Sequence, residues 1–158
     1  MLCHYSPYKV AEIFKMLATL YPGRIDMGIG RAPGGDQLAT AALAFPGRNQ
    51  DATSYEIQAS MLAEILKGQL PPEHPFSTLQ LMPNGPEVPQ QWMLGSGTGS
   101  AALAGQLDMG FALALFIGTH ERPVTIFEQH RQARKEADHS GPSREMLAAA
   151  VICADSTE

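Results

Sequence analysis

Apolar residues spaced three and four positions apart predict two amphipathic helices in the first half of the chain. The first helix covers residues 7–20, because Ser6 is a plausible N-cap and Pro7 suits the first helical position. Tyr21-Pro22-Gly23 is expected to end it. The second helix covers residues 52–67.

The segment between these helices has a different pattern. Ile25, Met27 and Ile29 alternate with other residues, which predicts a short strand over 24–30. Residues 31–49 are rich in Gly, Pro and Ala, and we expect mainly loop there.

The second half begins with a long irregular segment and then alternates strands with helices. Closely spaced prolines in 69–89 exclude a long helix and predict a surface excursion. Loops of this length inside a compact domain are usually functional or disordered. The expected strands are 91–94, 110–116 and 148–154, and the expected helices are 101–107 and the polar 123–137.

Alternation of helices and strands implies parallel strands joined by crossover helices, and therefore the α/β class. The pattern contains about four β/α units, and eight such units form a TIM-type (β/α)8 barrel of typically ~250 residues. We therefore expect residues 1–158 to be a single domain with the architecture of a partial TIM-type barrel.

Composition narrows the functional classes only slightly. The 11 Lys and Arg against 16 Asp and Glu give a net charge of −5, which argues against a nucleic-acid or anionic-membrane partner. No apolar run reaches the ~18 residues of a membrane span. Cys3 and Cys153 form no metal-binding pair and favour a reducing compartment, so we expect a cytoplasmic globular protein without a metal site.

The glycine-rich run Gly95-Ser96-Gly97-Thr98-Gly99-Ser100 stands between an expected strand and an expected helix. Glycines there let a ligand approach the backbone, and free N–H groups at the start of a helix favour a phosphate. Ser96, Thr98 and Ser100 add hydroxyl donors. The spacing is neither a P-loop nor a dinucleotide fingerprint, and a tight turn with a Ser/Thr helix cap explains it equally well.

Arg31 follows the first expected strand, at the edge where ligands collect in parallel α/β folds. Its guanidinium could bind phosphate oxygens, or it could form a salt bridge with Asp36. Among the histidines, His130 is expected to be solvated on a polar helix, and the spacing of the histidines fits no metal site. His4 lies just before a helix and is the one histidine placed near a strand-to-helix connection.

Taken together, these segments resemble the bacterial luciferase-like flavin monooxygenases, in the branch of alkanal monooxygenase-like oxidoreductases. The specific part is Gly23-Arg24-Ile25-Asp26 followed by Gly30-Arg31-Ala32-Pro33-Gly34. Further agreement, in the same order along nearly the whole chain, comes from His4 to Glu12, Trp92 to Ser96, Thr119-His120-Glu121 and Val151 to Asp155.

The resemblance implies a TIM-type barrel that binds reduced FMN and uses O2 to oxygenate a small organic substrate such as an aldehyde. Arg31 and Ser96 match family residues that contact the flavin phosphate. Thr98 and Ser100 flank the family's phosphate-binding hydroxyl, whose own position is Gly99 here. The family also implies a homo-oligomer and a flavin reductase as electron donor.

Family members are about twice as long as this chain, so the resemblance implies a domain that is truncated at both ends. We interpret the chain as a piece or a reduced version of an FMN-dependent monooxygenase. Its cofactor-binding residues would be Arg31 and the Gly95–Ser100 turn, including Gly97, and His4 is the candidate catalytic residue. The 69–89 segment would cover the active site. The alternatives are a non-catalytic flavin- or phosphate-binding module that acts through oligomerisation, and an enzyme of the same fold that uses a deazaflavin.

Overall fold

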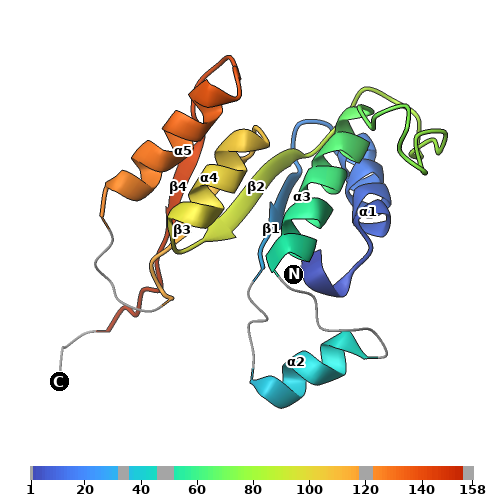
Figure 1. Cartoon of the computed structure of the whole chain (residues 1–158). Coiled ribbons are helices and arrows are strands. Elements are labelled where there is room, and N and C mark those ends of the chain that lie inside the picture. Colours follow the sequence, from blue (N-terminus) through green and yellow to red (C-terminus); the bar gives the residue numbers. More distant parts are fainter. Residues whose placement is uncertain (1, 32–35, 46–51, 118–122, 155–158) are drawn as a thin grey trace. The chain divides into compact units, whose positions relative to one another are not determined.

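The computed structural model describes residues 2–31, 36–45, 52–117 and 123–154, and it divides into two compact units, Met1–Trp92 and Met93–Glu158 (Figure 1). The calls on Gly34, on Thr119-His120-Glu121 and on Asp155 lie outside the described residues. No helix in the described ranges is long and apolar enough to cross a membrane.

The first unit holds three α-helices, a short 3-10 helix and the strand β1. Its elements are η1 (Leu2–His4), α1 (Pro7–Leu20), β1 (Asp26–Ile29), α2 (Gln37–Ala44) and α3 (Ala52–Lys67). Strand β2 (Gln90–Gly95) crosses into the second unit, which continues with α4 (Thr98–Gln106), β3 (Gly110–Ala114), α5 (Thr125–Glu136) and β4 (Glu145–Ala148). The strands are ordered β1-β2-β3-β4 in one sheet, and β3 pairs with β4 in parallel from Phe111↔Glu145 to Ala114↔Ala148.

Burial follows the strand patterns. In β1, Met27 and Ile29 are buried while Asp26 and Gly28 are exposed, which is the alternation of a strand with one covered face. All five residues of β3 are buried, as expected of a strand covered on both faces. The predicted helices 7–20 and 52–67 are confirmed with the same bounds, and α3 is followed by Gly68 at φ +65°.

The expectation of mainly loop over 31–49 is wrong, because α2 lies within it. Asp36 is the N-cap of α2, and its Oδ1 accepts a hydrogen bond from Ala39 N at 2.7 Å. The segment that follows is rich in Ala and Leu, the residues that best tolerate a helix. Asp36 therefore caps a helix.

Two expectations in the second unit also need correction. The predicted strand 148–154 is wrong except for Ala148, since β4 ends there and Ile152 is 95% exposed. His130 is fully buried instead of solvated. Its Nε2 donates to Met109 O at 3.0 Å, and its Nδ1 lies 3.2 Å from Glu145 Oε1. Sequence alone does not show which face of this charged helix packs against α4 and Phe111 of β3.

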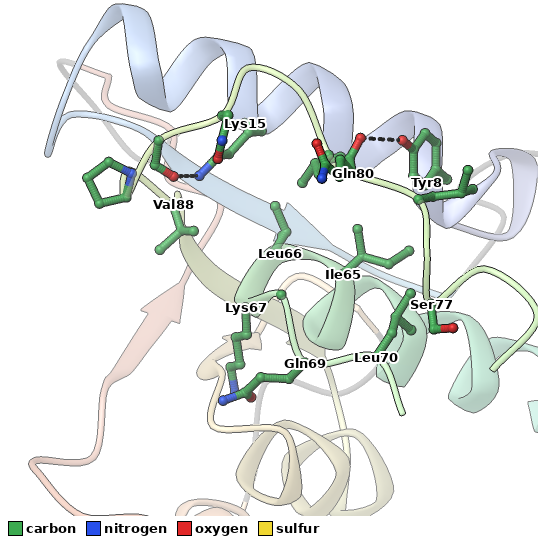
Figure 2. A pocket seen from close by; sticks show the side chains of 16 residues that line it. Tyr8, Lys15, Ile65, Leu66, Lys67, Gln69, Leu70, Ser77, Gln80 and Val88 are labelled. Carbon is green, nitrogen blue, oxygen red and sulfur yellow. Dashed lines mark hydrogen bonds between the residues drawn. The ribbon is translucent and has the colours of Figure 1, made fainter. Parts of the chain in front are cut away.

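The irregular segment 69–89 contains no helix or strand, as predicted, but it packs against α1 (Figure 2). The buried ammonium of Lys15 donates to the backbone carbonyls of Gly85 and Glu87, and Tyr8 OH donates to Gln80 O at 3.1 Å. Lys15 also lines a cavity of about 680 Å³ between this segment and the helices.

The 69–89 segment joins the sheet at the edge where the strands begin, the amino edge. Gln90 N, at the start of β2, donates to Ile25 O just before β1 at 3.1 Å. In a parallel α/β fold the ligand site lies at the opposite, carboxyl edge of the strands. The expectation that 69–89 covers the active site is not favoured by this connection and stays a prediction.

Candidate functional site

The turn between β2 and α4 is built around an uncapped helix N-terminus. The N-cap is Gly97, which has extended backbone (φ −151°, ψ 174°) and makes no side-chain cap hydrogen bond. The backbone ladder of α4 begins with Ala101 N donating to Gly97 O at 3.2 Å. The N–H groups before Ala101 therefore have no acceptor within the helix. No acidic residue stands in the first turn of α4.

The glycines of this turn have different roles. A Cβ on Gly95 would lie 2.3 Å from the Cβ of Ser100, so Gly95 is needed for Ser100 to pack against the end of β2. A Cβ on Gly97 or Gly99 would meet nothing within 4 Å, so the space above the first turn is open. An open approach to free N–H groups, with the positive end of the helix dipole behind them, fits a phosphate.

The structure changes the predicted boundary of this turn. Helix α4 begins at Thr98 and not at Ala101, so Thr98 and Ser100 belong to its first turn. The side chain of Ser100 lies against Gly95, whereas Thr98 is exposed. Ser96 is half-buried in the connection that precedes the helix.

Arg31 lies in the first unit, two residues after the end of β1, and is exposed. The segment η1 runs beside this end of the strand, because Leu2 N donates to Gly30 O at 3.3 Å and Cys3 Sγ donates to Arg31 O at 3.6 Å. Within the described ranges no carboxylate lies within 4 Å of the guanidinium, so it stays available for an anion.

His4 ends η1, and both of its ring nitrogens are buried without a hydrogen-bond partner in the described part of the chain. The same holds for Tyr55 OH and Gln58 Oε1 on α3, the helix that η1 contacts. Burial raises the pKa of Tyr55 to about 12, with the positive charge of Arg31 lowering it and Cys3 raising it. Tyr55 is therefore a neutral phenol in the neighbourhood of Arg31.

The predicted site residues thus belong to two different compact units of the chain. His4 and Arg31 belong to the first unit, and the run from Gly95 to Ser100 belongs to the second. Sequence reasoning missed Tyr55 and Gln58. Their helical spacing indicates a packed face, and only burial without a partner distinguishes them from ordinary core positions.

Comparison with known proteins assigns the chain to a family. Residues 1–158 match the family model described as luciferase-like monooxygenase. The N-acetyl-S-alkylcysteine monooxygenase of Bacillus subtilis (strain 168) is 37% identical over 162 aligned residues, which cover 100% of this chain and 46% of that protein. The chain therefore spans about half the length of the curated relatives it matches.

Solved structures agree with this assignment. The crystal structure of apo-MsnO8 matches with a TM-score of 0.72 and 32% identity, over 93% of this chain and 42% of that one. An F420-dependent secondary alcohol dehydrogenase, in complex with an F420-acetone adduct, matches with a TM-score of 0.67. Its 15% identity, over 90% of this chain and 44% of that one, shows the fold alone. The predicted α/β fold, as part of a TIM-type barrel, is confirmed.

Proposed function

The chain belongs to the luciferase-like monooxygenase family, and we propose that it carries the flavin-phosphate site of an FMN-dependent monooxygenase. The observation that carries the proposal is the start of α4. There an uncapped N-terminus, open space above Gly97 and Gly99, and the lack of acidic residues in the first turn suit a dianionic phosphate.

Arg31 is proposed as a second phosphate contact. Its support is the family resemblance of the Gly30-Arg31 segment and the place of the residue after a strand of a parallel sheet. A guanidinium without a carboxylate partner within the described ranges can form two parallel hydrogen bonds to phosphate oxygens.

Reduced flavin, when bound, supplies two electrons for O2 activation, so that one oxygen atom enters the organic substrate and the other leaves as water. The chain's own residues would bind and orient this cofactor and exclude water from it. His4 is the proposed catalytic residue, because its unpartnered ring nitrogens can donate or accept a proton. An aldehyde is the proposed class of substrate.

Sedimentation with absorbance recorded in the flavin band tests binding directly, with FMN and riboflavin as ligands. We expect wild-type protein to bind FMN more tightly than riboflavin, since only FMN has a phosphate. A charge-assisted hydrogen bond is worth about 1.5–3 kcal/mol, so Arg31→Ala should weaken FMN binding by about 10- to 150-fold and leave riboflavin binding unchanged.

Gly97→Val provides the matching test at α4. The extended backbone of Gly97 accepts a β-branched residue, and a Cβ there meets no atom, so the fold should persist while the side chain fills the space proposed for phosphate. We expect FMN binding to fall to the level of riboflavin. Equal affinity of wild-type protein for FMN and riboflavin would overturn the proposed phosphate site. Tighter binding of F420 than of FMN would identify F420, and not FMN, as the cofactor.

His4→Gln and His4→Ala test the histidine. We expect both variants to bind FMN as the wild type does and to lose oxygenation of a long-chain aldehyde. A flavin-loaded His4→Ala protein with unchanged activity would remove His4 from the site.

A further inference from the structure

Tyr55 and Gln58 form a polar pair that the protein itself does not satisfy. Tyr55 is 4% exposed, and its hydroxyl has no hydrogen-bond partner in the described part of the chain. Gln58 lies one turn further along α3, at a spacing that puts both side chains on the same side of the helix, and its buried Oε1 is equally without a partner. Neither residue belongs to the proposed phosphate contacts.

Buried polar groups such as the Tyr55 hydroxyl and the Gln58 amide oxygen are expected to have a hydrogen-bond partner. Leaving one buried polar group unpaired costs about 1–3 kcal/mol, and buried polar atoms in folded proteins almost always have a partner. Two on adjacent turns of one helix, together with the ring nitrogens of His4 on the contacting η1, are therefore expected to meet a ligand or ordered water.

The types of the groups restrict the ligand. A phenol can donate and accept, but an amide oxygen can only accept, so Gln58 Oε1 requires a donor from the ligand. A phosphate or carboxylate oxygen offers no donor at neutral pH and would leave that atom unpaired. A hydroxyl both donates and accepts, which makes a polyol the simplest partner for the pair.

The position of the pair connects it to Arg31. Tyr55 lies within the electrostatic influence of Arg31 and Cys3, and Cys3 Sγ donates to Arg31 O at 3.6 Å. The unpaired groups thus lie in the same unit as the residues that follow β1, on the helix that contacts η1, and Tyr55 lies in the electrostatic neighbourhood of the guanidinium proposed to bind phosphate. In FMN the ribityl chain, a polyol, is attached directly to the phosphate.

We propose that Tyr55 and Gln58 bind hydroxyl groups of the flavin's ribityl chain, an inference that rests on the proposed function. Tyr55 remains protonated at neutral pH, so it can donate to one hydroxyl while Gln58 accepts from another. The pair then acts on cofactor binding and does not touch the reacting ring.

Three flavins separate the contributions of ring, chain and phosphate. Lumiflavin has the ring without the ribityl chain, riboflavin adds the chain, and FMN adds the phosphate. Quenching of flavin fluorescence on titration with the 158-residue protein gives an affinity for each. We expect Tyr55→Phe and Gln58→Leu each to weaken riboflavin and FMN binding by about tenfold, without changing lumiflavin binding.

Tyr8→Phe is the matched control. Tyr8 lies in the same unit, but its hydroxyl donates to Gln80 O and takes no part in the pair. This variant should bind all three flavins as the wild type does.

The outcomes distinguish the inference from the proposed function. Unchanged riboflavin binding by Tyr55→Phe and Gln58→Leu would overturn the inference. If wild-type protein binds FMN more tightly than riboflavin, but riboflavin no more tightly than lumiflavin, the inference fails while the phosphate site stands. Absence of binding for all three flavins would overturn both.

Discussion

Replacing Glu145 by glutamine tests the polar network that joins α5 to β4. Glu145 is the first residue of β4, and its Oε1 accepts hydrogen bonds from Ser143 Oγ at 2.8 Å and from Arg131 Nε at 3.0 Å. The same Oε1 faces Nδ1 of the fully buried His130 at 3.2 Å. Glutamine keeps the shape of the side chain and removes the charge.

The magnitude follows from the exposure of each partner. The side chain of Arg131 is 56% exposed, so solvent screens its ion pair with Glu145 and this pair contributes little to stability. Hydrogen bonds to a charged acceptor are worth about 1.5–3 kcal/mol, roughly twice a neutral bond, and glutamine still offers an oxygen to Ser143. We expect the free energy of unfolding to fall by about 2 kcal/mol, which lowers the Tm by about 4–8 °C for a chain of this size.

The stability difference between wild type and Glu145→Gln should depend on pH in a defined direction. Burial raises the pKa of Glu145, but hydrogen bonds from Arg131, Ser143 and His130 and the charge of Arg131 outweigh it, so the pKa lies below its usual value. A carboxyl with a lowered folded pKa stabilises the fold above its unfolded pKa, and this stabilisation is lost as the pH falls through the folded value. Thermal unfolding followed by circular dichroism should therefore show a difference between wild type and Glu145→Gln at pH 7 that disappears in acid.

Glu136→Gln serves as the control, because Glu136 is exposed and its side chain accepts a hydrogen bond from Gln132, one turn earlier in the same helix. It should unfold as the wild type does at both pH values. A Glu145→Gln protein as stable as the wild type at pH 7, or a difference that grows in acid, would refute the reasoning.

Three further predictions concern single contacts. Lys15→Met removes a buried ammonium that donates to two carbonyls of the 69–89 segment, so limited proteolysis should cut that segment at least tenfold faster. An unchanged rate of cleavage would show that these hydrogen bonds do not hold the segment in place. Asp36→Ala removes the N-cap of α2 and should lower the helical circular dichroism signal and the stability by about 1 kcal/mol, whereas Asp36→Ser should retain both. Gly95→Ala places a Cβ against Ser100 and should lower the Tm by several degrees, and the double variant Gly95→Ala/Ser100→Gly should recover most of this loss.

The elements best predicted from the sequence have local start and stop signals. Helix α1 begins at Pro7 directly after its N-cap Ser6 and ends before Pro22-Gly23, and its predicted bounds agree with the structure. The buried run of β3 is equally clear, because a short continuous apolar segment suits a strand covered on both faces. Helix α2 was missed because neighbouring Gly and Pro hid a good N-cap and an Ala-rich segment.

Tertiary contacts decide the remaining cases. His130 is a charged-helix residue by pattern, yet it is buried because its ring lies beside Phe111 of β3 and its Nε2 donates to Met109 O. The apolar residues Val151 and Ile152 suit a strand by composition, but β4 ends at Ala148 and leaves them exposed. For the site, the glycine-rich turn was visible in the sequence, whereas Tyr55 and Gln58 became candidates only through burial without a partner.

Several polar groups at the two edges of the strands differ in how they are satisfied, although Gln91 Oε1 in β2 and Arg144 Nε just before β4 are also buried without a partner in the described part of the chain. In the first unit, Lys15 is fully engaged with the segment that enters β2, whereas Tyr55 and Gln58 remain unpaired in the neighbourhood of Arg31 after β1. In the second unit, His130 donates to the carbonyl just before β3 and faces the first residue of β4, whereas the N-terminus of α4 after β2 is uncapped. The satisfied groups of Lys15 and His130 stabilise the fold, whereas the buried unsatisfied groups of Tyr55 and Gln58 carry a cost that a bound ligand or ordered water would offset. For this reason the carboxyl edge is where substitutions should change ligand binding more than stability.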